Sequence, residues 1–358
     1  MSTVYLILEN GSVFKGCSFG AKGEAVGEVV FTTGMTGHIE SLTDPNNYGQ
    51  IVTHTFPLLG NYGVIPDDFE SNCNSAIGCI VKHQCQEPSN FRSEGTLDAF
   101  LKSRNIIGIC GIDTRKLTKI IRENGTMNAM ITDTIPENFD MNLYITIDRL
   151  KLHKLSNAVD AVSTKEKYTI NDGGKYRIAL LDLGVKNSLK KALIQHDCAV
   201  TVYPFDTPPQ EILAENPNGI VISGGPGDPA DCKDIQDNIK MMTGVPILGI
   251  GLGHQLLAAA NRFKTTKMRH GHRGSNQPSK DLMSGKVHIV KQNHSYTVEF
   301  EKTDRAEQWF KNVNDGSCDG IIYNDMPAMS VQFHPNDYVI GEFVGKICGT
   351  HPRAYRPK

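Results

Sequence analysis

The chain has 358 residues, of which 39% are hydrophobic and 21% are charged, and its formal net charge is −2. This length predicts two or three domains with ordinary buried cores, and the composition argues against disorder. A nearly neutral chain gives no electrostatic reason to expect nucleic acid or an anionic membrane as a partner. We find no apolar run long enough to cross a bilayer and no basic N-terminal segment typical of a signal peptide.

Nine cysteines are scattered along the chain, and none of them forms a C-x-x-C pair. This odd, dispersed set is typical of reduced thiols rather than of a disulfide framework, so we expect a cytoplasmic protein. Cys73, Cys79 and Cys85 are evenly spaced, but the spacing does not match a zinc-binding pattern, and we expect no metal there.

The first half is predicted to be strand-rich. Residues 5–14 favour a hairpin around Asn10 and Gly11, because Asn-Gly suits the two-residue turn between antiparallel strands. Further elements are expected as strands at 27–31 and 50–55 and as helices at 97–104 and 114–124. Asp113 is placed to cap the second of these helices.

The second half has a different pattern. A polar segment, 136–175, ends in Gly173-Gly174 and is predicted to connect an N-terminal domain of residues 1–135 to a C-terminal domain of residues 176–358. Beyond it, strands are expected at 176–183, 199–203, 219–223 and 245–249, with helices at 186–196 and 234–243. This alternation predicts an α/β fold with a mostly parallel sheet flanked by helices, whose sites lie beyond the carboxyl ends of the strands.

Gly251 is the centre of an apolar run, a Gly-x-Gly-x-Gly turn and the start of a helix. Such a strand-turn-helix strains its central residue and points the side chain into a cleft at the helix N-terminus. Hydrolases place Ser or Cys at this position, whereas glycine brings only its tolerance of positive φ. A close-packing turn is the simpler interpretation, and a dinucleotide fingerprint is weakly supported this late in the chain.

Two other segments also fall at predicted strand ends. The glycine-rich loop 223–229 could present backbone N–H groups to a ligand, or it could be a tight turn only. His334 follows an apolar strand and, taken alone, is more often structural than catalytic.

The glycine-rich loop 223–229, the strand-turn-helix elbow at Gly251 and His334 follow one another along the chain in an order that resembles the class I glutamine amidotransferases. In that family a Cys at the elbow attacks the glutamine amide, and a His-Pro-Glu segment supplies the base and the carboxylate that orients it. The resemblance narrows to the small-subunit family of carbamoyl phosphate synthase and runs over nearly the whole chain. The segments that carry it are 27–37, 43–45, 57–63, 89–92, 111–118, 227–229, 252–257, 267–274, 277–278 and 292–294.

Carried over residue by residue, this resemblance places the nucleophile position at Gly251, the base at His334 and the orienting position at Asn336. It also implies a set of glutamine-binding residues: Asn46, Gly225, Gly227, Leu252, Gln255, Asn293, Ser295 and Tyr296. Because the nucleophile and the carboxylate are both replaced, we expect that glutamine hydrolysis is lost and that the chain is a pseudoenzyme.

The resemblance implies a large synthetase subunit as partner, glutamine as a possible ligand, and carbamoyl phosphate for pyrimidine or arginine synthesis as the product of the pair. ATP and Mg²⁺ are expected only on the large subunit, since this chain has no phosphate-binding Gly-x-x-x-x-Gly-Lys-Ser/Thr motif. Two alternatives stay open: an ordinary hydrolysing subunit seen as a nucleophile-deleted variant, and a glutamine-binding regulatory module. A dehydrogenase is a distant fourth reading.

His270 and His272 form a His-x-His pair in a basic loop. No third ligand lies near them in the sequence, so a structural role is favoured over a metal site.

Overall fold

The computed structural model describes residues 2–73, 75–133 and 139–349. The chain forms two compact units, Met1–Ala158 and Val159–Lys358. We describe each unit by itself.

Unit 1 is built on a closed seven-stranded barrel. Its strands, in barrel order, are β1 (Thr3–Leu8), β2 (Val13–Gly20), β8 (Ile107–Cys110), β6 (Gly78–Ile80), β4 (Gln50–His54), β3 (Ala25–Thr32) and β9 (Met127–Thr132). The hairpin predicted around Asn10 and Gly11 is confirmed, because β1 and β2 pair antiparallel with Leu6 opposite Phe14. Apolar side chains of alternate strand residues fill the barrel, which supplies one buried core.

Helices α1 (His38–Leu42), α2 (Leu97–Ser103) and α3 (Thr114–Asn124) also belong to unit 1. The helices predicted at 97–104 and 114–124 are therefore confirmed. The Asp113 side chain accepts a hydrogen bond from the Lys116 N–H, which is the predicted cap of α3. Leu117 and Ile121, one turn apart, carry the buried face of that helix.

The segment expected to connect the domains contains regular structure. It carries α4 (Phe139–Leu152), α5 (Ala158–Val162) and β10 (Tyr168–Ile170), while residues 134–138 lie outside the described part of the chain. Leu150 of α4 is fully buried and packs with Ile7 and Met130. This apolar contact explains why α4 belongs to unit 1 although its sequence pattern is weak; the domain boundaries themselves stay a prediction.

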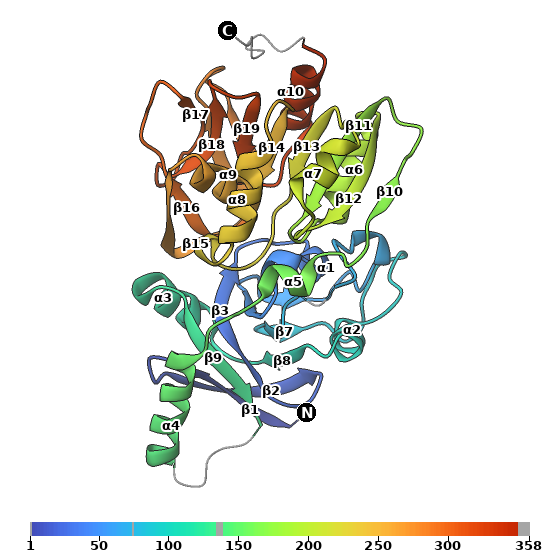
Figure 1. Cartoon of the computed structure of the whole chain (residues 1–358). Helices are drawn as coiled ribbons and strands as arrows, with labels where there is room; N and C mark the ends of the chain where they lie inside the picture. The colour runs from blue at the N-terminus through green and yellow to red at the C-terminus, as the bar shows by residue number, and fades with distance from the viewer. Residues whose placement is uncertain (1, 74, 134–138, 350–358) are drawn as a thin grey trace. The chain divides into compact units, whose positions relative to one another are not determined.

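Unit 2 contains a ten-stranded sheet (Figure 1). Its centre is parallel, in the order β12 (Cys198–Pro204), β11 (Tyr176–Asp182), β13 (Gly219–Ile222), β14 (Ile247–Ile250) and β19 (Ala328–Val331). Each of the four strands predicted for this domain is present. The α/β fold class with a parallel core is confirmed.

Helices cover both faces of this parallel centre. Successive residues of a strand point to opposite faces, so Leu180 and Leu181 enter different cores. One core is closed by α7 (Pro209–Ala214), α8 (Lys233–Met241) and α9 (Leu252–Ala260), and the other by α6 (Asn187–Gln195) and α10 (Asp337–Ile347).

An antiparallel extension continues the sheet beyond β19. It consists of β18 (Cys318–Tyr323), β16 (Val287–Glu299), β15 (Lys264–Asp281) and β17 (Ala306–Asn312). The long β15–β16 hairpin has irregular register between Lys267 and His272 and between Gly274 and Gln277. Trp309 and Phe310 of β17 are buried and anchor this part of the sheet.

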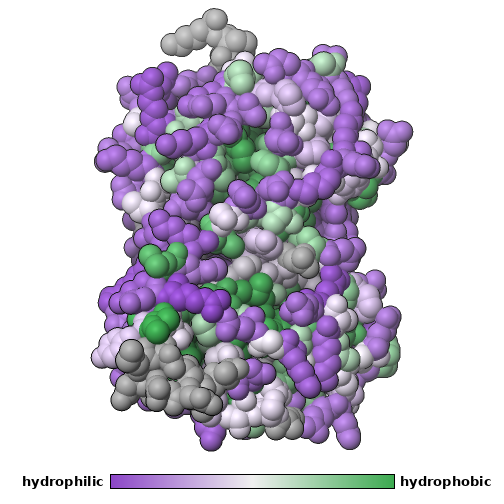
Figure 2. Space-filling model, turned by 60° about the horizontal axis from the view of Figure 1, so that its bottom comes forward, coloured by the Kyte–Doolittle hydropathy of each residue, from purple (hydrophilic) through white to green (hydrophobic). Residues whose placement is uncertain are grey.

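Figure 2 shows a largely hydrophilic face, on which hydrophobic side chains gather in small groups. Among the helices of the described residues, none combines the length and the apolar character that crossing a bilayer requires.

Candidate active site

The elbow predicted around Gly251 is present. β14 ends at Ile250 and α9 begins at Leu252, so Gly251 alone makes the turn, with φ 55° and ψ −112°. Its N–H donates to the Val331 carbonyl at 2.9 Å, and its carbonyl accepts from the Gln255 N–H at 3.1 Å. The first bond ties the turn to the end of β19, and the second starts helix α9.

Glycine suits this position for a backbone reason rather than for lack of room. A Cβ built on Gly251 would lie 3.3 Å from the Gly224 Cα and 3.9 Å from the Gln332 carbonyl oxygen. That space tolerates a side chain after a small adjustment. The backbone conformation, however, is one that residues with a Cβ rarely adopt. Glycine therefore adopts this turn without the strain that a residue with a Cβ would carry.

The glycine-rich loop follows β13 and approaches the elbow. Ser223 is fully buried, and its hydroxyl accepts from the Leu183 N–H and donates to the Gly224 carbonyl, both at 2.9 Å. A Cβ on Gly225 would lie only 2.1 Å from the Leu183 oxygen, so only glycine fits there. Gly227 has φ 98°. The loop backbone at Gly225 therefore packs directly against Leu183, and Gly227 supplies the positive φ that the turn needs.

His334 lies just beyond β19. Its N–H donates to the Lys291 carbonyl at 2.9 Å, which fixes the backbone against β16. On the side chain, Nε2 lies 3.2 Å from the Ser188 hydroxyl, which belongs to the first turn of α6. Sequence reasoning missed Ser188; its only signal was its place just after the β11 strand end. The carboxyl ends of β11, β13, β14 and β19 therefore meet at this site.

Asn336 is the N-cap of α10. Its Oδ1 accepts from the Val339 N–H at 3.1 Å, and its Nδ2 lies 3.4 Å from the His288 Nδ1. These contacts direct the amide toward α10 and β16. An amide here caps a helix well, but it has no negative charge with which to stabilise an imidazolium.

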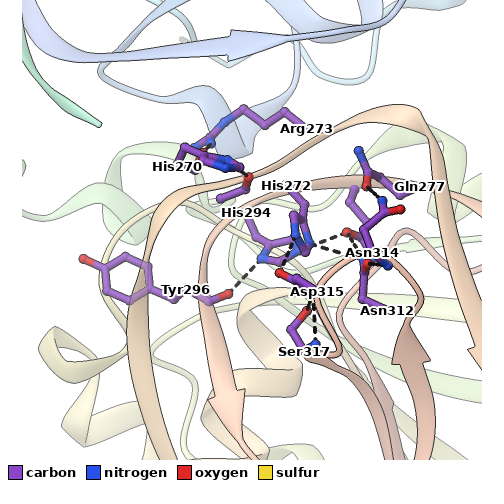
Figure 3. Close-up of polar contacts among 12 residues, drawn as sticks. His270, His272, Arg273, Gln277, His294, Tyr296, Asn312, Asn314, Asp315 and Ser317 are labelled. Atoms are coloured by element: carbon purple, nitrogen blue, oxygen red, sulfur yellow. Dashed lines mark hydrogen bonds and ion pairs between the residues drawn. The ribbon is translucent and has the colours of Figure 1, made fainter. Parts of the chain in front are cut away.

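Several predicted glutamine-binding residues lie together in unit 2. The Gln255 side chain donates to the Tyr296 carbonyl and to the Gln332 side-chain oxygen, each at 3.0 Å. The Ser295 hydroxyl accepts from the Arg273 guanidinium at 2.6 Å, and Asn293 is the strand partner of Arg273. Figure 3 shows Arg273 and Tyr296 on the two strands of the hairpin.

Two further positions complete the predicted set. Leu252 is buried at the start of α9. Asn46 lies in unit 1, in a short 3₁₀ helix, Pro45–Asn47, capped by the Asp44 side chain. The roles assigned to all of these residues in glutamine binding stay predictions.

A buried histidine next to the elbow links helix α9 to strand β19. His254 lies in the first turn of α9, and its Nδ1 lies 2.8 Å from the Ser330 hydroxyl of β19. Complete burial lowers the pKa of this imidazole to about 3, so the ring is neutral at physiological pH. It acts as a packing and hydrogen-bonding group, which its place one turn after Gly251 could have suggested.

Known proteins match both units. Residues 6–131 match the family model of the carbamoyl-phosphate synthase small chain, CPSase domain, and residues 179–339 match class I glutamine amidotransferase. A carbamoyl phosphate synthase small chain of Clostridium perfringens is 45% identical over 348 residues, covering 95% of this chain and 98% of the relative. One of Listeria monocytogenes is 41% identical over 363 residues, covering 98% of each.

A solved glutamine amidotransferase of Thermotoga maritima resembles the chain more distantly, with 17% identity and a TM-score of 0.37 over 44% of this chain and 75% of that one. The family assignment depends on the sequence relatives, which span both units. The chain therefore belongs to the carbamoyl phosphate synthase small-chain family.

Proposed function

We propose that this chain is a small subunit that supports a large carbamoyl phosphate synthetase subunit without hydrolysing glutamine itself. The observation that carries the proposal is Gly251 at the elbow, where the chemistry needs a sulfur or oxygen nucleophile. ATP and Mg²⁺ would act on the large subunit, free ammonia would be the nitrogen source, and the product would serve pyrimidine or arginine synthesis.

The expected effect of a missing nucleophile is large enough to favour complete loss of glutamine hydrolysis over a partial decrease. Removing the nucleophile of a serine protease triad lowers turnover by about a millionfold, because triad residues act as a unit. None of the nine cysteines lies in the elbow, in the loop 223–229 or next to His334. Asn336 adds a second defect, because it cannot stabilise a protonated His334 as a carboxylate would.

The glycine-rich loop beside the elbow is nevertheless suited to bind an amide side chain. A glycine-rich backbone such as that of Gly225 and Gly227 is of the kind that presents N–H groups to a ligand, and the amide of Gln255 is held in place by Tyr296 and Gln332. We therefore expect glutamine to bind without release of glutamate.

The test is a coupled assay of glutamate release, with and without a large subunit, together with glutamine titration by calorimetry. The unmodified chain should release no glutamate, and Gly251→Cys combined with Asn336→Glu should restore release. His334→Ala in the restored chain is the control and should abolish it again. Glutamate release at a normal rate by the unmodified chain would overturn the proposal.

The retained donors also favour a second candidate, a glutamine-binding regulatory module. Carbamoyl phosphate synthesis from ammonia by the large subunit separates the two functions. Stimulation by this chain in the absence of glutamine supports the subunit role, whereas stimulation or inhibition only when glutamine is added supports the regulatory one.

A further inference from the structure

We propose that His272, His294 and Asp319 form a binding site for a divalent metal ion of the zinc type within the antiparallel part of unit 2. The three residues come from β15, β16 and β18 and are all buried. One ligand atom of each lies within 4.8 Å of the others. The grouping is independent of the proposed function, because none of the three residues is assigned to the elbow chemistry.

The hydrogen bond of His272 leaves one ring nitrogen available for a metal. Its Nε2 lies 3.0 Å from the Asp315 carboxylate, to which the ring donates (Figure 3). Nδ1 then carries the lone pair, and the Asn312 amide nitrogen lies 3.4 Å from it, a long contact that a metal could replace. A histidine that donates to a carboxylate through one nitrogen and binds metal through the other is common in zinc sites.

His294 has the same arrangement with a carbonyl in place of the carboxylate. Its Nδ1 donates to the Tyr296 carbonyl at 2.8 Å, which Figure 3 also shows. Nε2 therefore carries the lone pair, and the Gln292 Oε1, itself an acceptor, lies 3.4 Å from it. The two imidazoles stand edge to face, with ring centroids 5.3 Å apart, on strand-paired residues.

Asp319 supplies the strongest evidence for a cation. Its side chain is fully buried, and neither carboxylate oxygen has a hydrogen bond of normal geometry within the described residues. The side chains of Ser279, Gln292 and Asn312 interact with it and favour its charged form, but none of them carries a positive charge. Burying a carboxylate without a balancing positive charge is unfavourable, and a bound metal ion would supply that charge.

Two imidazole nitrogens and one carboxylate oxygen are a typical zinc ligand set, with a water molecule as the fourth ligand. Zinc–ligand bonds near 2.1 Å place tetrahedral ligands about 3.4 Å apart, so the three side chains would move inward on binding. His270, the other half of the His-x-His pair, is not part of the group; the ligands come from paired strands instead.

A metal here would join β15, β16 and β18. The hairpin formed by β15 and β16 also carries Asn293 and Ser295, so metal removal should loosen this part of the candidate active site. This consequence rests on the proposed function, whereas metal binding itself does not.

The experiment uses the full-length chain, stripped with a chelator and titrated with Zn²⁺ by calorimetry and with Co²⁺ by visible absorption. We expect one equivalent to bind at micromolar concentration or tighter, with the intense d–d bands of tetrahedral cobalt. Asp319→Asn, nearly equal in size, should weaken binding by at least about tenfold. His196→Asn is the control, because His196 also pairs with a carboxylate, Asp337, and should leave binding unchanged.

Circular dichroism establishes that the variants are folded. Should Asp319→Asn fail to fold, X-ray absorption of the zinc-loaded unmodified chain reports the ligands directly, and two imidazoles must appear. Absence of saturable binding, binding unchanged in a folded Asp319→Asn chain, or a spectrum without imidazole ligands would each overturn the proposal.

Discussion

The hydroxyl of Ser188 lies 3.2 Å from Nε2 of His334. It reaches the imidazole from the first turn of α6, whereas His334 follows β19 on another part of the sheet. In a thiol-based mechanism a base nitrogen must accept the proton of the nucleophile. Ser188 contacts one ring nitrogen of His334, so it bears on how readily this imidazole could accept a proton from a thiol placed at position 251.

We predict that Ser188→Ala raises glutamate release by the chain that carries Gly251→Cys and Asn336→Glu. Loss of one hydrogen bond worth about 1 kcal/mol corresponds to roughly fivefold in rate. The rate of glutamate release at saturating glutamine measures it. Ser188→Thr keeps the hydroxyl and is the control. A fall in turnover with Ser188→Ala would show instead that the hydroxyl holds His334 in its productive position.

Asn336 should matter more for stability than for chemistry in the unmodified chain. Its Oδ1 caps α10 through the Val339 N–H, so Asn336→Ala should lower the free energy of unfolding by about 1 kcal/mol. Asn336→Asp keeps the cap and adds a charge that the helix N-terminus favours, so it should be neutral or slightly stabilising. Urea denaturation measures both variants, and equal losses for the two would contradict the capping role.

The elbow and the parallel sheet could be predicted from the sequence because their signals are local. The apolar run before Gly251 and the glycine spacing fix the strand-turn-helix within a dozen residues. Alternation of apolar runs and helical segments then predicts the parallel sheet at the centre of unit 2, although not the order of its strands. The same holds for α3, whose cap and buried face both lie within one short segment.

The antiparallel extension could not be predicted in this way. The β15 segment, Lys264–Asp281, is polar and charged, and it forms a strand because β16 and β17 pair with it. The grouping of His272, His294 and Asp319 depends on that strand pairing, since these residues lie more than twenty positions apart in the chain. The contact between Ser188 and His334 likewise follows from the fold alone.

Substitution of Gly253 tests whether the close approach of α9 to β13 is needed for stability. Its N–H donates to the Ser223 carbonyl at 3.1 Å, and a Cβ there would lie 2.3 Å from the Ile222 carbonyl oxygen. Because the obstacle is backbone, Gly253→Ala should lower the free energy of unfolding by about 2–3 kcal/mol. Gly173→Ala, with open space around its Cβ, is the control and should change it little. Comparable stability of the two variants would mean that α9 readily moves away from the sheet.

Lys346 makes the free energy of unfolding of unit 2 depend on pH in the alkaline range. The residue is 6% exposed in α10, its ammonium donates to the Ala328 carbonyl at 3.2 Å, and burial lowers its pKa from 10.5 to about 8. Between these two pH values the unfolded chain binds more protons than the folded chain. The free energy of unfolding should therefore rise as the pH increases from about 8 toward 10.5, and the buried charge is a cost at pH 7.

Lys346→Met removes the charge and keeps an apolar stem of similar length. At pH 7 we expect the free energy of unfolding to increase by about 1–3 kcal/mol, less the lost hydrogen bond to Ala328. The gain should shrink as the pH approaches 10, where the native lysine is already neutral. Denaturant titrations at both pH values measure it, with the exposed Lys240→Met as the control. An equal gain in the free energy of unfolding at both pH values would mean that methionine simply packs better. Removal of the charge can stabilise the protein only where the lysine is protonated.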